Sequence, residues 1–131
     1  MYPAAATGVG WADLPAAIRR DADTPWFKSW ILFDPAAAMK KVSQPVLILH
    51  GGLDREIGVA NADRLEVLSR ARAKLPATHT QKTVVANANH LLIAATTGEP
   101  EEYPSLVQKD IAPEATAAVV EWLRTVTAKK N

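Results

Sequence analysis

The sequence has no cysteine, no marked excess of charge of either sign and no long apolar run. Without cysteine, a disulfide framework, thiolate catalysis and cysteine-rich zinc sites are excluded. The 15 basic and 14 acidic residues give a formal net charge of +1, so no strong field attracts nucleic acid or anionic lipid. No segment approaches the roughly 20 apolar residues that a membrane-spanning helix needs. We therefore expect neither nucleic acid nor a membrane among the partners.

What the sequence does contain is the composition of an ordinary globular protein. Its 131 residues, 48% of them hydrophobic, are enough for one domain with a real core. The first residues lack the charged start and apolar core of a secretory signal, which predicts a cytoplasmic location. Residues 1–24, rich in Ala, Gly and Pro, are interpreted as an irregular or helical N-terminal segment, and residues 25–131 as the main domain.

Helical and strand patterns alternate along the chain. Residues 46–49 are apolar at every position, which is typical of a strand covered on both faces in a parallel sheet. Segment 94–110 contains Gly98, Pro100 and Pro104 and is expected to be an irregular excursion. The alternation predicts an α/β fold with a short parallel sheet of about two strands flanked by helices. The expected helices cover 14–20, 25–33, 36–41, 61–73 and about 111–126, and the expected strands 46–49 and 82–86.

Three acidic or hydroxyl residues, Thr24, Asp34 and Asp110, are expected to cap the helices that follow them. In the helix at 61–73, an inner stripe is expected at Leu65, Leu68 and Ala71. His50 is interpreted as a strand-end residue.

Two polar residues follow the two predicted strands. Asp54 comes after a Gly51–Gly52 turn at the end of the first strand, and His90 comes shortly after the second. Because adjacent parallel strands are about 4.8 Å apart, loops leaving their carboxyl ends can bring these side chains together. A carboxylate that fixes the tautomer of a histidine makes that histidine an effective general base. Taken singly, each residue also has a plainer explanation, Asp54 as a turn cap and His90 as a loop histidine.

Several motifs together resemble the C-terminal part of the α/β-hydrolases, closest to the prolyl-oligopeptidase-like and dienelactone-hydrolase-like branch. The resemblance covers most of the chain, from about residue 26 to residue 123. It rests on Phe33-Asp34-Pro35, the strand and turn from Pro45 to Asp54, Asn89-His90-Leu91-Leu92 and Val120-Glu121-Trp122-Leu123.

The resemblance implies a serine hydrolase, such as an esterase or a peptidase, that cleaves an ester or peptide-like acyl bond in a small-molecule or peptide substrate. Asp54 is then the orienting acid and His90 the general base of a Ser-His-Asp triad. The resemblance implies no cofactor, and no metal site is expected, because no pair of histidines has a suitable ligand spacing.

The chain departs from this family in lacking a nucleophile elbow. None of its four serines, Ser29, Ser43, Ser69 and Ser105, stands in a Gly-x-Ser-x-Gly sequence. Ser105 lies in the excursion after His90 and is the weak candidate for the nucleophile, whose identity stays open. Tyr103, from the same excursion, is the candidate substrate contact.

The predicted sheet is also too small. Two strands alone form a marginal sheet with open edges. We therefore expect the partial α/β-hydrolase fold to be completed by homo-oligomerisation or by a missing N-terminal part. The alternative function is a non-catalytic assembly or interaction module derived from an α/β-hydrolase.

Overall fold

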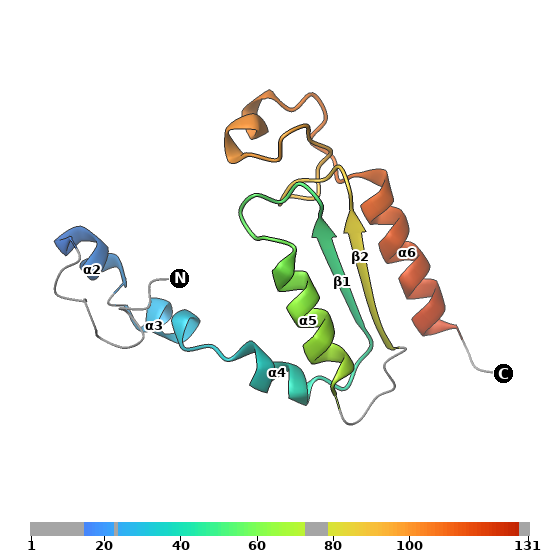
Figure 1. The fold of residues 1–131 in the computed structure, drawn as a ribbon, viewed down its shortest axis with the longest axis horizontal. Coiled ribbons are helices and arrows are strands. Elements are labelled where there is room, and N and C mark those ends of the chain that lie inside the picture. Colours follow the sequence, from blue (N-terminus) through green and yellow to red (C-terminus); the bar gives the residue numbers. More distant parts are fainter. Residues whose placement is uncertain (1–14, 23, 73–78, 129–131) are drawn as a thin grey trace. The chain divides into compact units, whose positions relative to one another are not determined.

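The structure is a computed structural model that describes residues 15–22, 24–72 and 79–128 (Figure 1). The chain divides into two compact units, residues 1–38 and residues 39–131, whereas the sequence suggested a boundary after residue 24. Residues 1–14 of that predicted N-terminal segment lie outside the described residues. Within the described residues, no helix is both long and apolar enough to cross a membrane. The helices and strands are α2 (Ala16–Ala22), α3 (Pro25–Ile31), α4 (Pro35–Lys41), β1 (Val46–Gly51), α5 (Ala60–Arg70), β2 (Thr80–Val85), η3 (Pro100–Ser105) and α6 (Pro113–Thr127).

Two of the short helices begin at the caps that the sequence predicts. The hydroxyl of Thr24 accepts the backbone N–H of Phe27 at 3.1 Å, at the start of α3. Asp34 Oδ1 accepts the N–H groups of Ala36 and Ala37 at 2.9 and 3.0 Å, at the start of α4. In each helix a proline follows the cap and occupies the first helical position, where its missing N–H costs nothing.

Strands β1 and β2 form the predicted short parallel sheet. Their pairing runs from Val46 opposite Thr80 to Gly51 opposite Val85. β1 extends two residues beyond its predicted end at Leu49, and β2 begins two residues before its predicted start at Lys82. The structure thus has a small α/β fold in which both strands end at the same edge of the sheet.

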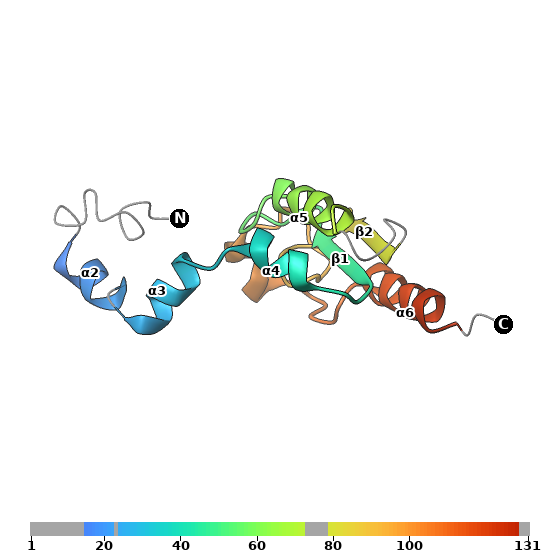
Figure 2. The same ribbon diagram turned by 90° about the horizontal axis from the view of Figure 1, so that it is seen from below.

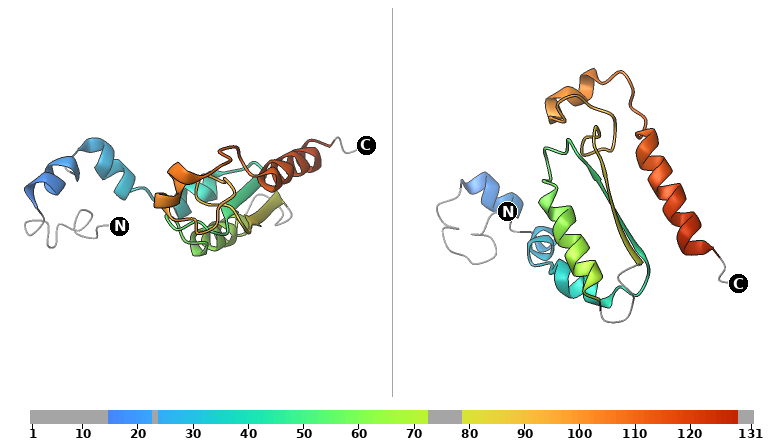
Figure 3. Two further views of the ribbon diagram at one scale, coloured as in Figure 1. Left: turned by 90° about the horizontal axis from the view of Figure 1, so that it is seen from above. Right: turned by 45° about the vertical axis from the view of Figure 1, so that its right-hand side comes forward.

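The two long helices cover opposite faces of this sheet (Figures 2 and 3). Successive side chains of a strand point to opposite faces. On one face, Ser69 of α5 shares a hydrogen bond of 2.8 Å with Thr80 of β2. On the other face, Val85 of β2 packs with Ala112 and with Ala115 of α6. The small side chains on α6 allow the helix to approach the strands closely.

Helix α6 begins later than the sequence predicts. The predicted cap at Asp110 is wrong, because α6 starts at Pro113 and its N-cap is Ala112, which makes no side-chain capping bond. The preceding Ile111 pairs instead with Ile93 in an isolated bridge. The N–H of Ala112 donates to the carbonyl of Leu92 at 2.8 Å. This pairing attaches the start of α6 to the loop that carries His90.

Candidate functional site

The site lies where the turns after β1 and β2 are joined backbone to backbone. The N–H of Gly52 donates to the carbonyl of Val85 at 2.8 Å, and that of Leu53 donates to the carbonyl of Ala88 at 2.9 Å. Gly51 is required here, because a Cβ at that position would stand 2.3 Å from the carbonyl oxygen of Asn89. The close approach sets Asp54, from the first turn, opposite the residue that follows Asn89.

Asp54 uses its two carboxylate oxygens for different tasks. Oδ1 accepts the backbone N–H groups of Glu56 at 3.0 Å and Ile57 at 2.8 Å, which closes the turn of residues 54–57, here called the acid turn. Oδ2 lies 2.9 Å from Nδ1 of His90. The side chain of Asp54 is only 5% exposed. The two interpretations of Asp54 as a turn cap and as the partner of a histidine are therefore both correct.

His90 is held with one ring nitrogen against this carboxylate. The preceding Asn89 is fully buried, and its Oδ1 accepts the N–H groups of Leu91 and Ile93 at 3.0 and 3.1 Å. The turn continues through Leu92, which has a φ of 59°. Because a carboxylate only accepts, Nδ1 carries the proton in the neutral ring, and Nε2 is left with its lone pair. Among the described residues, no hydrogen bond reaches Nε2, and the side chain is 35% exposed.

The pair perturbs the protonation of both partners. The hydrogen bond and the charge of Asp54 raise the pKa of His90 above its usual value, and the charge of Glu56 adds to this effect. Burial acts to raise the pKa of the Asp54 carboxyl, but hydrogen bonds from Ile57 and His90 outweigh it and the pKa lies below its usual value. The aspartate is thus ionised at neutral pH, and the imidazolium form of His90 is stabilised.

His50 supports the acid turn from the end of β1. Its Nε2 lies 3.0 Å from the carbonyl oxygen of Ile57 and 3.6 Å from Oδ2 of Asp54. Its Nδ1 lies 2.7 Å from the carbonyl oxygen of Gly51, and the residue is 9% exposed. The sequence identified His50 only as a strand-end residue. Its contact with the acid turn was missed, although the spacing of four residues to Asp54 was visible.

The excursion of residues 94–110 is ordered around the carboxylate of Glu102, which the sequence did not single out. Oε1 accepts the N–H of Thr96 at 2.7 Å, and Oε2 accepts the N–H groups of Thr97 and Gly98 at 2.9 and 2.8 Å. The hydroxyl of Thr97 donates to the same oxygen. These donors, with Thr96 the strongest, lower the pKa of Glu102 to about 2. The predicted irregular segment therefore contains a compact turn and the helix η3.

The excursion is fastened to the acid turn. Arg55 Nε donates to the carbonyl of Thr97 at 3.3 Å. The hydroxyl of Tyr103 donates to Glu56 Oε1 at 2.7 Å, and this bond raises the pKa of Tyr103 to about 12. Tyr103 therefore remains protonated throughout the neutral range. Its predicted role as a substrate contact stays a prediction, with the hydroxyl hydrogen already donated to Glu56.

A cavity of about 250 Å³ lies beside the pair. Its lining is mainly aliphatic and includes four consecutive residues of β1, from Ile48 to Gly51, together with Asp54 and His90. Consecutive strand residues point to alternate faces, so the cavity follows the edge of β1 that β2 leaves unpaired.

None of the four serines hydrogen-bonds to His90. Ser105 Oγ donates to the carbonyl of Glu102 at 2.8 Å, and Ser69 is buried against Thr80. Ser43 is exposed ahead of β1, and Ser29 Oγ donates to the carbonyl of Trp26 in the other unit. Ser105 thus stays a candidate nucleophile without a contact to the base. Within the described residues, no group of three potential ligands is arranged to hold a metal ion.

No protein-family model matches the chain, and neither a curated protein nor a solved structure was found to match it.

Proposed function

We propose that the chain is the C-terminal part of an α/β-hydrolase-like enzyme that cleaves ester or peptide-like acyl bonds. The observation that carries this proposal is the 2.9 Å contact between Asp54 Oδ2 and His90 Nδ1. The two residues follow adjacent parallel strands, and the Nε2 of His90 is left available to a substrate or a nucleophile. The small α/β sheet and the motifs around the pair support the same assignment.

In this proposal His90 is the general base. Its Nε2 takes the proton of a serine hydroxyl as the serine oxygen attacks the acyl carbonyl, and Asp54 stabilises the resulting imidazolium. When the tetrahedral intermediate collapses, His90 returns the proton to the leaving alcohol or amine, and water then releases the acyl group by the same route. The reaction needs no cofactor and no metal.

The nucleophile comes from outside the copy of the chain that carries the acid and the base, in place of the weak candidate Ser105, whose hydroxyl donates to the carbonyl of Glu102. This inference is supported by the four serines, none of which hydrogen-bonds to His90, and by the unpaired edge of β1. A second copy of the chain or an N-terminal part of a longer hydrolase would supply it. The chain on its own would also lack part of the oxyanion hole, and each missing donor costs roughly 10²–10³ in rate. Without that serine, His90 in the isolated chain takes its proton from a water molecule that attacks a reactive ester, so the expected activity is slow.

The test is hydrolysis of a short-chain activated ester by the purified chain and by His90→Ala, with His79→Ala as the matched histidine control. We expect His90→Ala to lose the turnover and His79→Ala to keep it. A fully effective general base contributes roughly 10²–10⁴-fold to the rate, which sets the upper limit of the loss.

The rate should also depend on pH. Only neutral His90 can accept the proton, and Asp54 raises the pKa of His90. The rate should therefore rise with pH through a value above that of an ordinary histidine, and Asp54→Asn should move this rise to lower pH. Equal rates in the wild type and His90→Ala would overturn the enzymatic assignment.

A second candidate function, a non-catalytic assembly module, is favoured by the character of β1. The strand is apolar from Val46 to Leu49 and carries no charge along its unpaired edge. Such an edge is a template for pairing with another chain. The two functions differ in their dependence on His90, because association through β1 would be unchanged in His90→Ala.

A further inference from the structure

The Tyr103 hydroxyl ties the segment that follows His90 to the turn that begins at Asp54. It donates to Glu56 Oε1 at 2.7 Å, and Tyr103 belongs to the excursion into which the chain continues after His90. The backbone N–H of Glu56 in turn donates to Asp54 Oδ1, and Asp54 Oδ2 contacts His90 Nδ1. These three hydrogen bonds and the chain from His90 to Tyr103 together close a ring through Asp54, Glu56, Tyr103 and His90, here called the four-residue ring.

The excursion that carries Tyr103 is itself held in place by close backbone contacts and hydrogen bonds. Gly98 has a φ of 78°, and a Cβ there would lie 1.7 Å from the carbonyl oxygen of Leu53, so the excursion is seated directly on the residue before Asp54. Glu102, adjacent to Tyr103, binds the backbone N–H groups of residues 96–98. Because the backbone around Tyr103 is already ordered, its side chain loses little conformational entropy when it binds Glu56.

We propose that Glu56 and Tyr103 are positioning residues, which hold the loop of His90 against Asp54 by closing the four-residue ring. The proposal rests on the proposed function only in giving His90 the role of base. It goes beyond that function by assigning a task to the excursion and to two side chains outside the triad.

The expected consequence is a large effect on geometry with a small effect on stability. A single hydrogen bond of this kind contributes roughly 1 kcal/mol to folding, so its loss leaves the chain folded. Catalytic geometry is far more sensitive, since a displacement of about 1 Å can cost roughly 10²-fold in rate. Tyr103→Phe removes only the hydroxyl, and Glu56→Gln removes the charge while keeping the size of the side chain.

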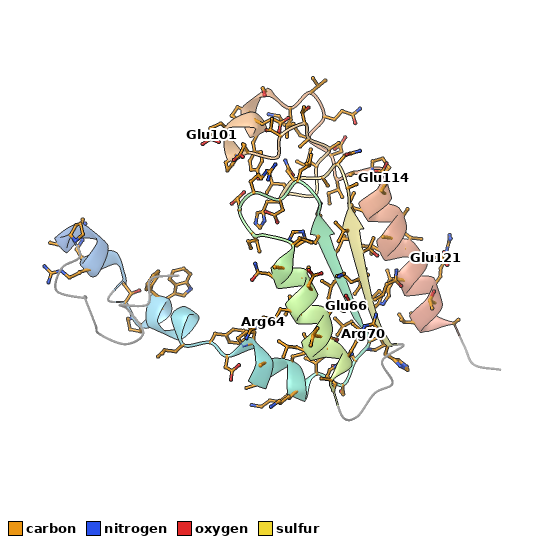
Figure 4. The ribbon with its side chains drawn as sticks, viewed as in Figure 1. Arg64, Glu66, Arg70, Glu101, Glu114 and Glu121 are labelled. Atoms are coloured by element: carbon orange, nitrogen blue, oxygen red, sulfur yellow. The ribbon has the colours of Figure 1, made fainter. Side chains whose placement is uncertain are left out.

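The experiment is nuclear magnetic resonance on the full chain labelled with ¹⁵N. The proton shared by His90 Nδ1 and Asp54 gives a resonance far downfield, which reports on their hydrogen bond directly. We expect this resonance in the wild type and its broadening or loss in Tyr103→Phe, with a smaller broadening in Glu56→Gln, whose amide oxygen can still accept the Tyr103 hydroxyl. Glu101→Gln is the matched control, because Glu101 is an exposed carboxylate of the same helix η3 (Figure 4). It should leave the resonance unchanged.

The titration of His90 distinguishes a change in the position of its ring from the loss of the Glu56 charge. Because the carboxylate of Glu56 raises the pKa of His90, Glu56→Gln should lower the titration midpoint. Tyr103→Phe retains that carboxylate and should not lower the midpoint by this route, although it disturbs the shared proton. The downfield resonance of the double variant should be no more disturbed than that of the worse single variant, because both substitutions act on the same hydrogen bond.

An unchanged downfield resonance in both Tyr103→Phe and Glu56→Gln would overturn the proposal, and so would additive effects in the double variant. Neither measurement needs turnover. The two proposals can therefore fail independently. If the resonance test contradicts the ring, the ester-hydrolysis test of His90 is unaffected, and if His90 proves inactive in that test, the resonance still shows whether the ring exists.

Discussion

Arg72 is buried just beyond the end of α5, and its guanidinium donates to neutral oxygens of the described residues. Nε donates to the carbonyl of Ser69 at 2.7 Å, and one terminal nitrogen donates to the carbonyls of Val42 and Gln44 at 3.2 and 2.6 Å. The other terminal nitrogen donates to the hydroxyl of Thr80 at 3.2 Å. The carbonyls at the end of a helix favour positive charge. One side chain therefore joins α5 to the starts of both strands.

Replacing this residue should destabilise the fold. Arg72→Ala leaves buried carbonyls without donors, and we expect the free energy of unfolding to fall by about 2–4 kcal/mol. Urea denaturation measures the change. Arg64→Ala is the control, because Arg64 is an exposed arginine of α5 (Figure 4), and its loss should cost less than about 0.5 kcal/mol. Similar losses in the two variants would show that Arg72 does not tie the strands to the helix.

At this scale the sequence predicted Asp54 and His90 correctly as neighbours, because each follows a strand directly and parallel strands end together. It predicted Leu65, Leu68 and Ala71 as the inner stripe of α5, whereas Ala71 is exposed and Ser69 is buried. A polar residue becomes an inner residue only through its partner, here Thr80, which lies eleven positions away. Local periodicity contains no information about such a partner.

Among the elements, the excursion differs most from its prediction. Its glycine and prolines predicted irregular structure, and the bends are there, but the segment is organised by the carboxylate of Glu102. The sequence could not reveal this role, because the N–H groups that Glu102 binds converge only after the chain has turned at Gly98. The excursion contacts the acid turn through Tyr103, and the residues that flank it, Ile93 and Ile111, pair with each other in an isolated bridge.

Gly98 is the position on which this element depends. In Gly98→Ala, a Cβ would meet the backbone of Leu53 and the residue would need a φ of 78°, so the excursion must move. We expect a loss of about 2 kcal/mol or more in the free energy of unfolding, together with faster amide exchange at residues 96–98. Gly58→Ala is the matched control, since a Cβ there meets nothing within 4 Å and its φ is not in the left-handed region. A loss in Gly98→Ala no larger than in this control would contradict the tight seating of the excursion.

At the scale of the whole molecule, the described residues form a sheet in which both strands are edge strands, β1 on one side and β2 on the other. The two strands differ in the charged residues near them. Lys82 of β2 forms ion pairs of 2.5 Å with Asp63 and 2.8 Å with Glu66 of α5, and Glu66 is also paired with Arg70 (Figure 4). β1 has no charged residue, and its edge lines the cavity beside His90. Charged residues near an edge discourage pairing with other chains, so β1 is the strand open to a partner.

The sequence could predict that two strands are too few, because a sheet of this size is marginal on its own. It could not predict which strand faces the partner, because that depends on ion pairs between α5 and β2 that form only in the folded unit. The apolar run of β1 was assigned to cover on both faces, and α5 and α6 supply part of that cover. The outer edge of β1 also needs a strand to pair with, and the described residues supply none.

We expect the chain to self-associate through the unpaired edge of β1. Sedimentation velocity at increasing concentration should show a dimer of the wild type, because pairing of two β1 edges extends the sheet in each copy. Leu47→Lys places a charge on β1, where an incoming strand must desolvate it, and the chain should stay monomeric. Gln81→Lys is the matched control, since Gln81 lies opposite Leu47 on β2 and is exposed. It should dimerise like the wild type. A monomeric wild type would direct the search to a different chain as the partner of β1, and equal dimerisation of all three proteins would place the contact away from β1.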